Sequence, residues 1–503
     1  MISIIKKIIC LLSFCSCVLV HADDAFATNA SKYPDLLSET QQSRHSSNLI
    51  IVDRKKIPAQ RPTLISSVLK TLANSLASSP VEGNVTRGIL LAAARRGDYL
   101  PAISWSLSHN YWNLAQVLIA ENSHPTPHWM RLSLALHQHD SAGIAQLLDH
   151  STDLSVGDRL QAQMELGRYH QARNEALRAL QNDPWNWQVR RKYVQAVRVS
   201  GDYLDLEGVW QNFSGLTLYG PRLRVRVNKN DNFGIMLDAD GLRQTAAPIS
   251  QLEAVPAWSS RERVGLFWRN SRFHAQVQVG EFRALRDNVT AKISAVWRAT
   301  NNGTFSGNFD LHDRSYQSPG LAVAGMMNRV SLQWTQHRNE WTGDIRGGVV
   351  QYQGQDGADV GIDRHVSVAA QWKDALGPWE TEIGPFADYH DLNRVANLHG
   401  VIAQALRPNA RNSASVLSGS YGDVGMRLQW GVWQPALTLG WTPYLALSIF
   451  ENTRFGPQYQ FDTGVSTPVF GADRLRIGFA QGQGGNGLAL NQRIIRVGYR
   501  LYF

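Results

Sequence analysis

Two short patterns in the sequence could support catalysis, and neither has the residues that such chemistry needs. Ser420 stands in the run Gly419–Gly422, which lacks the G-x-S-x-G spacing of a nucleophile turn. The glycine-rich run 482–487 lacks the Lys-Ser/Thr pair of a phosphate-binding loop. The sequence therefore predicts no enzyme activity and no cofactor.

Histidines could bind a metal ion, but their surroundings in the sequence do not favour it. His137 and His139 lie in a connection between expected helices, and His390 and His399 lie in or beside an expected loop. No carboxylate or imidazole partner stands at metal-site spacing. We interpret these histidines as solvated and expect no metal site.

In the C-terminal half, apolar and polar residues alternate over short runs. In Phe273–Val279, for example, Phe, Ala and Val alternate with His and Gln. Such strands suit a membrane barrel, whose outer face meets lipid and whose inner face meets water, because a charged side chain is costly on the lipid face. The expected lumen residues are Asp344, Arg346, Arg427, Arg476, Arg496 and Arg500.

The overall charge is basic, with 50 Lys and Arg against 41 Asp and Glu. Nucleic acid is not an expected partner, because the basic residues are spread over strand positions and form no run interleaved with aromatics. The segment Asp356–Asp391 is acidic instead. This pattern fits either a polarised pore that guides a charged polymer or the solvated faces of any porin.

Aromatic residues flank several short turns, as the interfacial girdle of an outer-membrane barrel requires. The expected girdle residues are Trp268, Trp297, Trp334, Trp341, Trp372 and Trp379.

Counting turns gives the number of strands. Further short turns are expected near Pro408, Gln434 and Ala472, which brings their number to about seven on the periplasmic side. Seven such turns and two free strand ends predict a transmembrane antiparallel β-barrel of about 16 strands over residues 216–503. Longer connections are expected at 283–290, 312–328, 353–364 and 483–490.

The last strand carries an independent signal. Val497, Tyr499, Leu501 and Phe503 alternate with polar or small residues, and the sequence stops on the aromatic ring. This pattern resembles the C-terminal signal that the barrel-assembly machinery recognises in outer-membrane proteins. That machinery and outer-membrane lipid are therefore expected partners.

The N-terminus predicts export from the cytoplasm. Residues 1–22 combine two lysines, an apolar run and a small-x-small ending, which is typical of a signal peptide. A lipoprotein signal is the less favoured alternative, because Phe14 precedes the candidate Cys15. Residues 23–81 show no sustained period and are interpreted as an irregular leader.

Residues 82–215 have helical spacing and a recurring Gly-x-Tyr pattern. Two of its copies, at Gly167 and Gly201, lie 34 residues apart, the tetratricopeptide period. A stack of such helix pairs would offer a concave periplasmic surface for binding, or it would act as a rigid spacer. The residues expected to pack the best copy are Gly167, Tyr169, Ala172, Ala179 and Pro184.

The fold class is therefore α+β and multidomain, with a tetratricopeptide-like solenoid followed by the barrel. No run of about 18 apolar residues occurs beyond the N-terminus, which excludes a polytopic helical membrane protein. Together these features place the protein in the outer membrane of a Gram-negative bacterium, with the helical repeats in the periplasm.

This combination of segments resembles exopolysaccharide export proteins of the outer membrane. The stretch Thr467–Leu475, followed by a glycine-rich loop and the final strand, is similar to the barrel of the Pel exporter, and the poly-N-acetylglucosamine and cellulose exporters are more distant. The resemblance implies a pore that exports an exopolysaccharide for biofilm. It also implies that the repeats bind the polymer or periplasmic and inner-membrane synthase and modification proteins.

Two other functions remain open from the sequence. The barrel could translocate surface lipoproteins or proteins, as lipoprotein assembly modulators do, and a lateral opening between the first and last strands would favour this. It could also be a plugged surface receptor that transports nothing, such as a phage-adsorption protein.

Overall fold

The computed structural model describes residues 72–73 and 84–503, with gaps at 123, 249, 271, 301, 339, 377–378, 432–439, 470–471 and 484–490. The expected signal peptide over 1–22 lies outside the described residues, and so does the leader over 23–81 apart from 72–73. The described chain divides into a helical unit that ends at Ala196 and a barrel unit that runs from Val197 to Phe503.

Short helices with one apolar face make up the region before the barrel. They are α3 (Asn84–Arg95), α4 (Leu100–Ser108), α5 (Trp112–Glu121), α6 (His128–His137), α7 (Ser141–His150), α8 (Val156–Glu165), α9 (Tyr169–Asn182) and α10 (Trp187–Ser200). Their apolar faces meet in shared cores; Leu160 of α8, Ala172 of α9 and Val189 of α10 are buried together in one of them. None of the described helices is long and apolar enough to cross a membrane.

The residues expected to pack a repeat lie around the connection between α8 and α9. Gly167 has a φ of +74°, a left-handed conformation that glycine adopts without strain at the end of a helix. Ala172 is buried, and Tyr169 and Ala179 pack against the same core. Pro184 is exposed just after α9. Small side chains thus lie where helices approach closely, while the tetratricopeptide assignment stays a prediction.

The junction between helices and barrel lies earlier than the sequence pattern predicted. α10 ends at Ser200 and β1 runs over Tyr203–Phe213, so the expected boundary between 82–215 and 216–503 was wrong by one strand. Gly201-Asp202-Tyr203 is not another repeat turn, since Tyr203 is the first residue of β1. Glycine and aspartate favour a break in the chain before a helix and before a strand alike, so these residue types could not distinguish the two.

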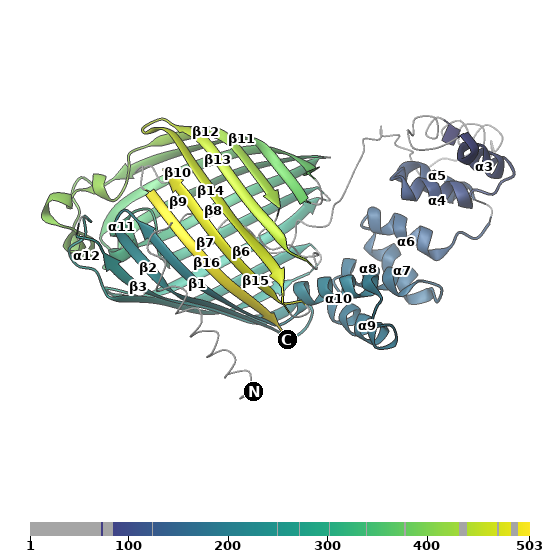
Figure 1. Cartoon of the computed structure of the whole chain (residues 1–503), viewed down its shortest axis with the longest axis horizontal. Helices are drawn as coiled ribbons and strands as arrows, with labels where there is room; N and C mark the ends of the chain where they lie inside the picture. The colour runs from purple at the N-terminus through teal and green to yellow at the C-terminus, as the bar shows by residue number, and fades with distance from the viewer. Residues whose placement is uncertain are drawn as a thin grey trace. The chain divides into compact units, whose positions relative to one another are not determined.

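The described strands form a closed antiparallel barrel of 16. Figure 1 shows its wall. Each strand pairs with its neighbours in sequence, and β1 pairs with β16 from Tyr203 opposite Tyr502 to Phe213 opposite Gln492. Among the described strands, none has an open edge that would expose unpaired backbone groups to lipid. The strands are β1 (Tyr203–Phe213), β2 (Leu216–Asn228), β3 (Phe233–Ala246), β4 (Trp258–Arg269), β5 (Phe273–Arg283), β6 (Asp287–Thr300), β7 (Gly303–Asp313), β8 (Gly325–Arg338), β9 (Trp341–Gly354), β10 (Asp359–Leu376), β11 (Trp379–Arg394), β12 (Tyr421–Gly431), β13 (Thr442–Asn452), β14 (Gly456–Pro468), β15 (Arg474–Gln483) and β16 (Asn491–Tyr502).

The predicted strand count is confirmed, although two errors in the turns cancelled. The turn over 229–232 between β2 and β3 was missed, and Pro408 was wrongly taken as a short turn, since it lies in the long connection from β11 to β12. The expected turn at Gln434 lies outside the described residues. The connections expected to be long at 283–290 and 353–364 are in fact short, because the strands on both sides extend into them.

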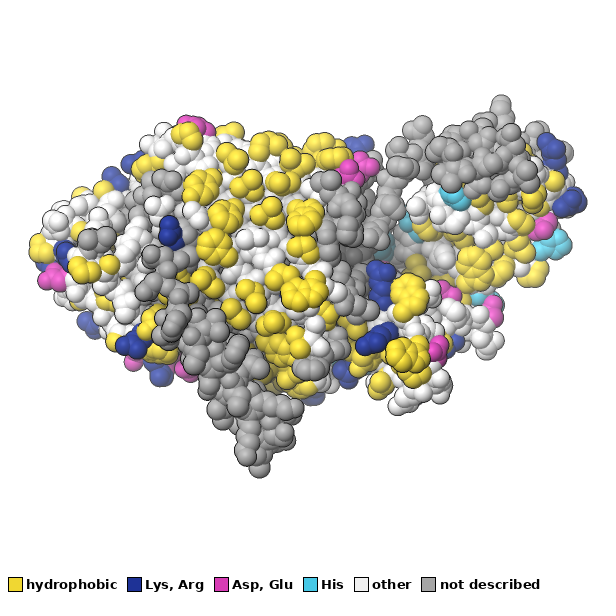
Figure 2. Space-filling model, viewed as in Figure 1, with side chains coloured by type: hydrophobic (Ala, Val, Ile, Leu, Met, Phe, Trp, Pro, Cys, Tyr) yellow, Lys and Arg dark blue, Asp and Glu magenta, His cyan; other side chains and the backbone are white. Residues whose placement is uncertain are grey.

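The two faces of the barrel differ in polarity as the alternation predicted. The outer wall carries exposed large apolar side chains such as Val264, Leu266, Val277 and Val279. Figure 2 shows such side chains spread over the visible wall of the barrel, with most charged side chains near its ends. The barrel thus has a lipid-compatible outer surface and directs its charges inward.

We expect an arginine to be costly at Val277 and tolerated at Gln276, because the first side chain points outward and the second inward on β5. Val277→Arg should lower the free energy of unfolding from a lipid bilayer by about 2–4 kcal/mol, whereas Gln276→Arg should leave it within about 1 kcal/mol of the wild type. Urea titration of protein folded into vesicles measures both. Equal losses from the two substitutions would show that the faces are wrongly assigned.

Candidate functional site in the barrel lumen

A buried carboxylate on the inner face binds side chains across the seam between β1 and β16. Asp205 on β1 accepts hydrogen bonds from Arg476 of β15 and from Arg500 of β16, whose Nη2 lies 2.6 Å from Oδ2. All three side chains are buried. The interaction therefore joins three strands across the seam between the first and last strands. Asp205 was not predicted, because it lies in the segment assigned to the helices.

The other expected lumen residues also face inward, but they do not meet in one place. Arg496 Nη2 lies 2.5 Å from Asp462 Oδ2. The guanidinium of Arg427 lies 4.7 Å from the centre of the Phe386 ring. Asp344 and Arg346, both on β9, bind the side chain of Gln333. The lumen wall thus offers charged groups that already have partners.

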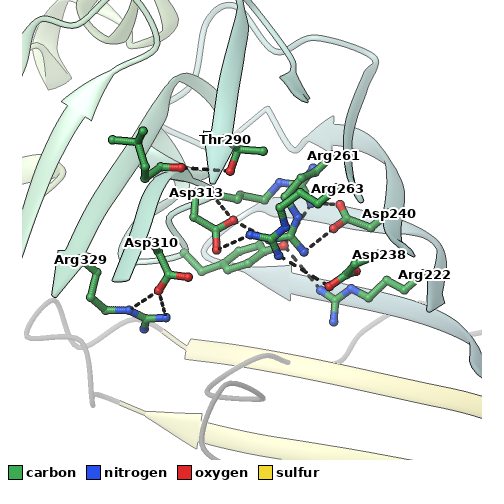
Figure 3. A network of polar contacts seen from close by, with 12 residues as sticks. Arg222, Asp238, Asp240, Arg261, Arg263, Thr290, Asp310, Asp313 and Arg329 are labelled. Atoms are coloured by element: carbon green, nitrogen blue, oxygen red, sulfur yellow. Dashed lines mark hydrogen bonds and ion pairs between the residues drawn. The ribbon is translucent and has the colours of Figure 1, made fainter. Parts of the chain in front are cut away.

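A larger ion-pair network lies on the wall formed by β2, β3, β4, β7 and β8 (Figure 3). Arg261 lies 2.6 Å from Asp240 and 2.5 Å from Asp313, and Arg263 lies 3.5 Å from Asp313. Arg329 donates two hydrogen bonds to Asp310, at 2.9 and 2.6 Å. Asp313 therefore reaches from β7 to β4, past the two strands between them.

Sequence reasoning missed this network, although a signal was present. Arg222 and Arg224 on β2 lie opposite Asp240 and Asp238 on β3, and the two residues of each pair are spaced by two positions. Such spacing puts like charges on one face of a strand, and opposite charges on the next strand could then pair. The pattern could have been found once the turn over 229–232 was recognised.

The network also holds the connection that follows β7. Arg314, the first residue of this connection, lies 2.7 Å from Asp240 and donates a hydrogen bond to Ser259 at 3.1 Å. Its side chain is 1% exposed, as is that of Asp240. The connection is therefore fixed to the opposite side of the network, on β3 and β4, before it enters the short helix α11 (Pro319–Ala324).

Two long connections form an apolar plug, which we define as α11 together with α12 (Gly400–Ala405) of the β11–β12 connection. Leu321, Val323 and Ile402 of these helices are completely buried. They share one core with residues of β1, β2 and β3 and with residues of β9 to β12. Strands eight places apart lie opposite each other in a closed barrel of 16, so this core spans the lumen. Figure 1 shows both helices at the end of the barrel away from the C-terminus.

Hydrogen bonds fix the second plug helix. Val401 N donates to Asp356 Oδ2 at 2.9 Å, and Glu253 N of the β3–β4 connection donates to Ala405 O at 2.8 Å. Asp356 belongs to the acidic segment Asp356–Asp391, whose members do not form a single lumen patch. Two others, Glu380 and Glu382, lie 2.6 and 3.5 Å from Lys373 Nζ.

One expectation about histidines was wrong. His390 is not a solvated loop residue, because it lies on β11 with Nδ1 2.9 Å from Asp363 Oδ2 on β10. His365 lies directly opposite it in the register. The three side chains come together because β10 and β11 are adjacent, and the sequence signal was the D-x-H pair at Asp363 and His365.

The expected girdle tryptophans lie near strand ends. Trp268, Trp297, Trp341 and Trp372 are exposed on the outer wall, and Trp334 is half-buried. The side chain of Trp379 lies outside the described residues.

The residues of the expected assembly signal lie on or just after β16. Val497, Tyr499 and Leu501 occupy one face of the strand, opposite to the inward Arg496 and Arg500, and Phe503 is exposed. Their recognition by the assembly machinery stays a prediction.

Loss of the Asp205 charge should weaken the barrel more than loss of another lumen carboxylate. Asp205→Asn removes the charge that both buried guanidiniums contact and should cost about 3–5 kcal/mol of unfolding free energy. Asp344→Asn is the matched control and should cost less than about 1 kcal/mol, because Asp344 is only half-buried and its side chain binds the neutral Gln333. Urea unfolding in detergent measures both, and equal costs would rule out a special role for Asp205.

Comparison with known proteins identifies the barrel. The family described as PelB, C-terminal beta barrel domain matches residues 199–502. No curated protein matches the chain. Similar solved structures include a "Bacterial polysaccharide outer membrane secretin", with 10% identity and a TM-score of 0.45, covering 60% of this chain and 99% of that chain. Acinetobacter baumannii OccAB1 has 11% identity and a TM-score of 0.34, covering 60% and 96%. Pseudomonas aeruginosa OpdK with vanillate has 11% identity and a TM-score of 0.31, covering 60% of this chain and 98% of that chain.

The family match spans more than half of the chain and includes the stretch Thr467–Leu475 and the final strand. It confirms the resemblance to the Pel exporter barrel and the expected location in the outer membrane. The chain belongs to the family of PelB C-terminal β-barrel domains.

Proposed function

We propose that this protein is an outer-membrane pore through which an exopolysaccharide leaves the cell. The observation that carries the proposal is a closed barrel of 16 strands that matches the PelB family over residues 199–502. A barrel of this strand number is wide enough for an aqueous channel when its interior is polar.

The lining of the barrel suits a hydrated polymer. Its arginines and carboxylates are held in pairs such as Arg261 with Asp240 and Arg496 with Asp462. Paired groups still offer donors and acceptors to sugar hydroxyls, but they bind without one deep energy well. Conduction needs such weak binding at many sites, because the chain must be able to leave each one.

The plug serves as the gate of this pore. Its apolar core crosses the lumen, so the conformation described above is closed, and export requires α11 and α12 to move. Both helices are only six residues long and belong to connections, not to the wall. The plug can therefore move without breaking the strand pairing of the barrel.

The seam argues against the lipoprotein alternative. A substrate that leaves sideways needs the first and last strands to separate, but β1 and β16 are paired along their whole length and tied by Asp205, Arg476 and Arg500. Weakening the plug distinguishes the pore from the receptor alternative, since a receptor would stay non-conducting when the plug is weakened.

The helices before the barrel then provide the periplasmic side of export. We assign them the binding of the polymer or of periplasmic and inner-membrane synthase and modification proteins, as the resemblance to the exporters implied. No catalytic step is assigned to this protein.

A charge inside the plug core should open the pore. Ile402→Asp places a carboxylate at a completely buried position, which should cost several kcal/mol in the closed state. The time-averaged conductance of the full-length protein in a planar bilayer should rise at least about tenfold, because each 1.4 kcal/mol shifts a two-state equilibrium about tenfold. Gln404→Asp on the exposed side of the same helix is the control and should conduct like the wild type.

Added polysaccharide should block the currents of Ile402→Asp. A silent Ile402→Asp barrel that is correctly folded would contradict the gate and favour a receptor.

Deletion of the gene in its host should stop the release of the polymer and leave it in the periplasm. Complementation with the full-length gene should restore secretion, as measured by sugar analysis of medium and periplasmic extract. Unchanged secretion together with loss of a lipoprotein from the cell surface would contradict export and support the translocation alternative.

A further inference from the structure

Three potential metal ligands meet on the lumen wall beside the plug. Asp363 and His365 lie two residues apart on the inward face of β10, and His390 lies opposite His365 on β11. One ligand atom from each side chain can be chosen so that all three lie within 4.8 Å of one another. Two imidazoles and one carboxylate form a donor set suited to late first-row divalent ions such as Zn²⁺, and less suited to Mg²⁺ or Ca²⁺.

The cluster has unused ligand capacity. Asp363 has a side chain that is 3% exposed, and its Oδ1 makes no hydrogen bond. The Nδ1 of His365 is also buried without a hydrogen-bond partner and lies 3.9 Å from Asp363 Oδ2. Buried polar atoms without partners are costly, and a metal ion bound between them would satisfy both.

The surroundings hold the two imidazoles in place. The His365 and His390 rings stack with their centroids 5.5 Å apart, and the Tyr421 ring stacks on His390 with a centroid distance of 4.6 Å. On β9, the residue opposite His365 is Gly348, where a Cβ atom would lie 2.9 Å from His365 Nε2. A glycine is therefore needed here for the imidazole to take its position.

We propose that Asp363, His365 and His390 bind a divalent transition-metal ion, with Zn²⁺ as the ion that fits best. The Nδ1 atom of His390, which contacts Asp363 in the metal-free site, would release any proton it carries to water and coordinate the ion, and Asp363 would supply a carboxylate oxygen. The three protein ligands leave at least one coordination position open to water or to a substrate hydroxyl.

The site lies next to the core that α11 and α12 share with the wall. Tyr421, which stacks on His390, belongs to the plug core, and so does Leu392, the next inward residue of β11. An ion bound here joins β10 to β11 at the base of the plug. The site does not depend on the identity of the exported cargo, because metal binding is measured without transport.

The test is zinc binding by the full-length protein folded in detergent. Isothermal titration with ZnCl₂ should show one saturable site that is lost in His365→Gln and in His390→Gln. The control is His337→Gln, an inward histidine of β8 whose Nδ1 lies near Thr342 and which is not part of the cluster. This control should keep the site, and MgCl₂ should give no binding heat.

Zinc affinity should fall at least about tenfold from pH 7.5 to pH 5.5, because protons compete for the imidazoles as the pH decreases. Heat-modifiable migration on gels shows whether each variant is folded. If a histidine variant fails to fold, the wild type is tested alone. Bound Co²⁺ should then give a visible absorption band that disappears when Zn²⁺ displaces it. Equal zinc binding by His365→Gln, His390→Gln and the wild type, or the absence of a Co²⁺ band, would overturn the proposal.

Discussion

Closure of the barrel on itself is the constraint on which the rest of this structure depends. In lipid, an unpaired strand edge would leave backbone donors and acceptors without partners, so β1 and β16 must pair. Their pairing buries Asp205 against Arg476 and Arg500 on the inner side. Because the outer face of the closed barrel meets lipid, its strands direct charged side chains into the lumen or place them near the ends of the barrel.

Charges forced into one interior space must be paired, and the pairing positions the plug. Asp240 and Asp313 bind Arg261, while Asp240 also binds Arg314 at the start of the connection that carries α11. The same network therefore fixes the connection that carries α11 to β3 and β4. The polar wall and the position of the plug are therefore two results of one arrangement of paired charges.

Much of the fold could be predicted because its signals are local. Alternation gave the strand faces, and the aromatic turn pattern together with an even number of strands gave the count of 16. The errors came from residue types that occur in two different kinds of local structure. Gly201-Asp202-Tyr203 connects a helix to a strand, yet it matches a helical turn, and Pro408 follows α12 inside the long β11–β12 connection, yet it matches a hairpin turn. Local residue types cannot resolve such cases, because the choice depends on what the next segment packs against.

The sequence by itself determined the class of the protein, namely an exported chain with helices before an outer-membrane barrel of about 16 strands, because periodicity is a property of neighbouring residues. It also placed Arg476, Arg496 and Arg500 on the inner face. Only the tertiary structure decided which charges pair, that two connections fill the lumen, and that His365 and His390 meet Asp363. These contacts join residues on different strands, in the case of Asp205 and Arg500 on the first and last strands of the sequence, and their register and closure are set by the whole ring of strands.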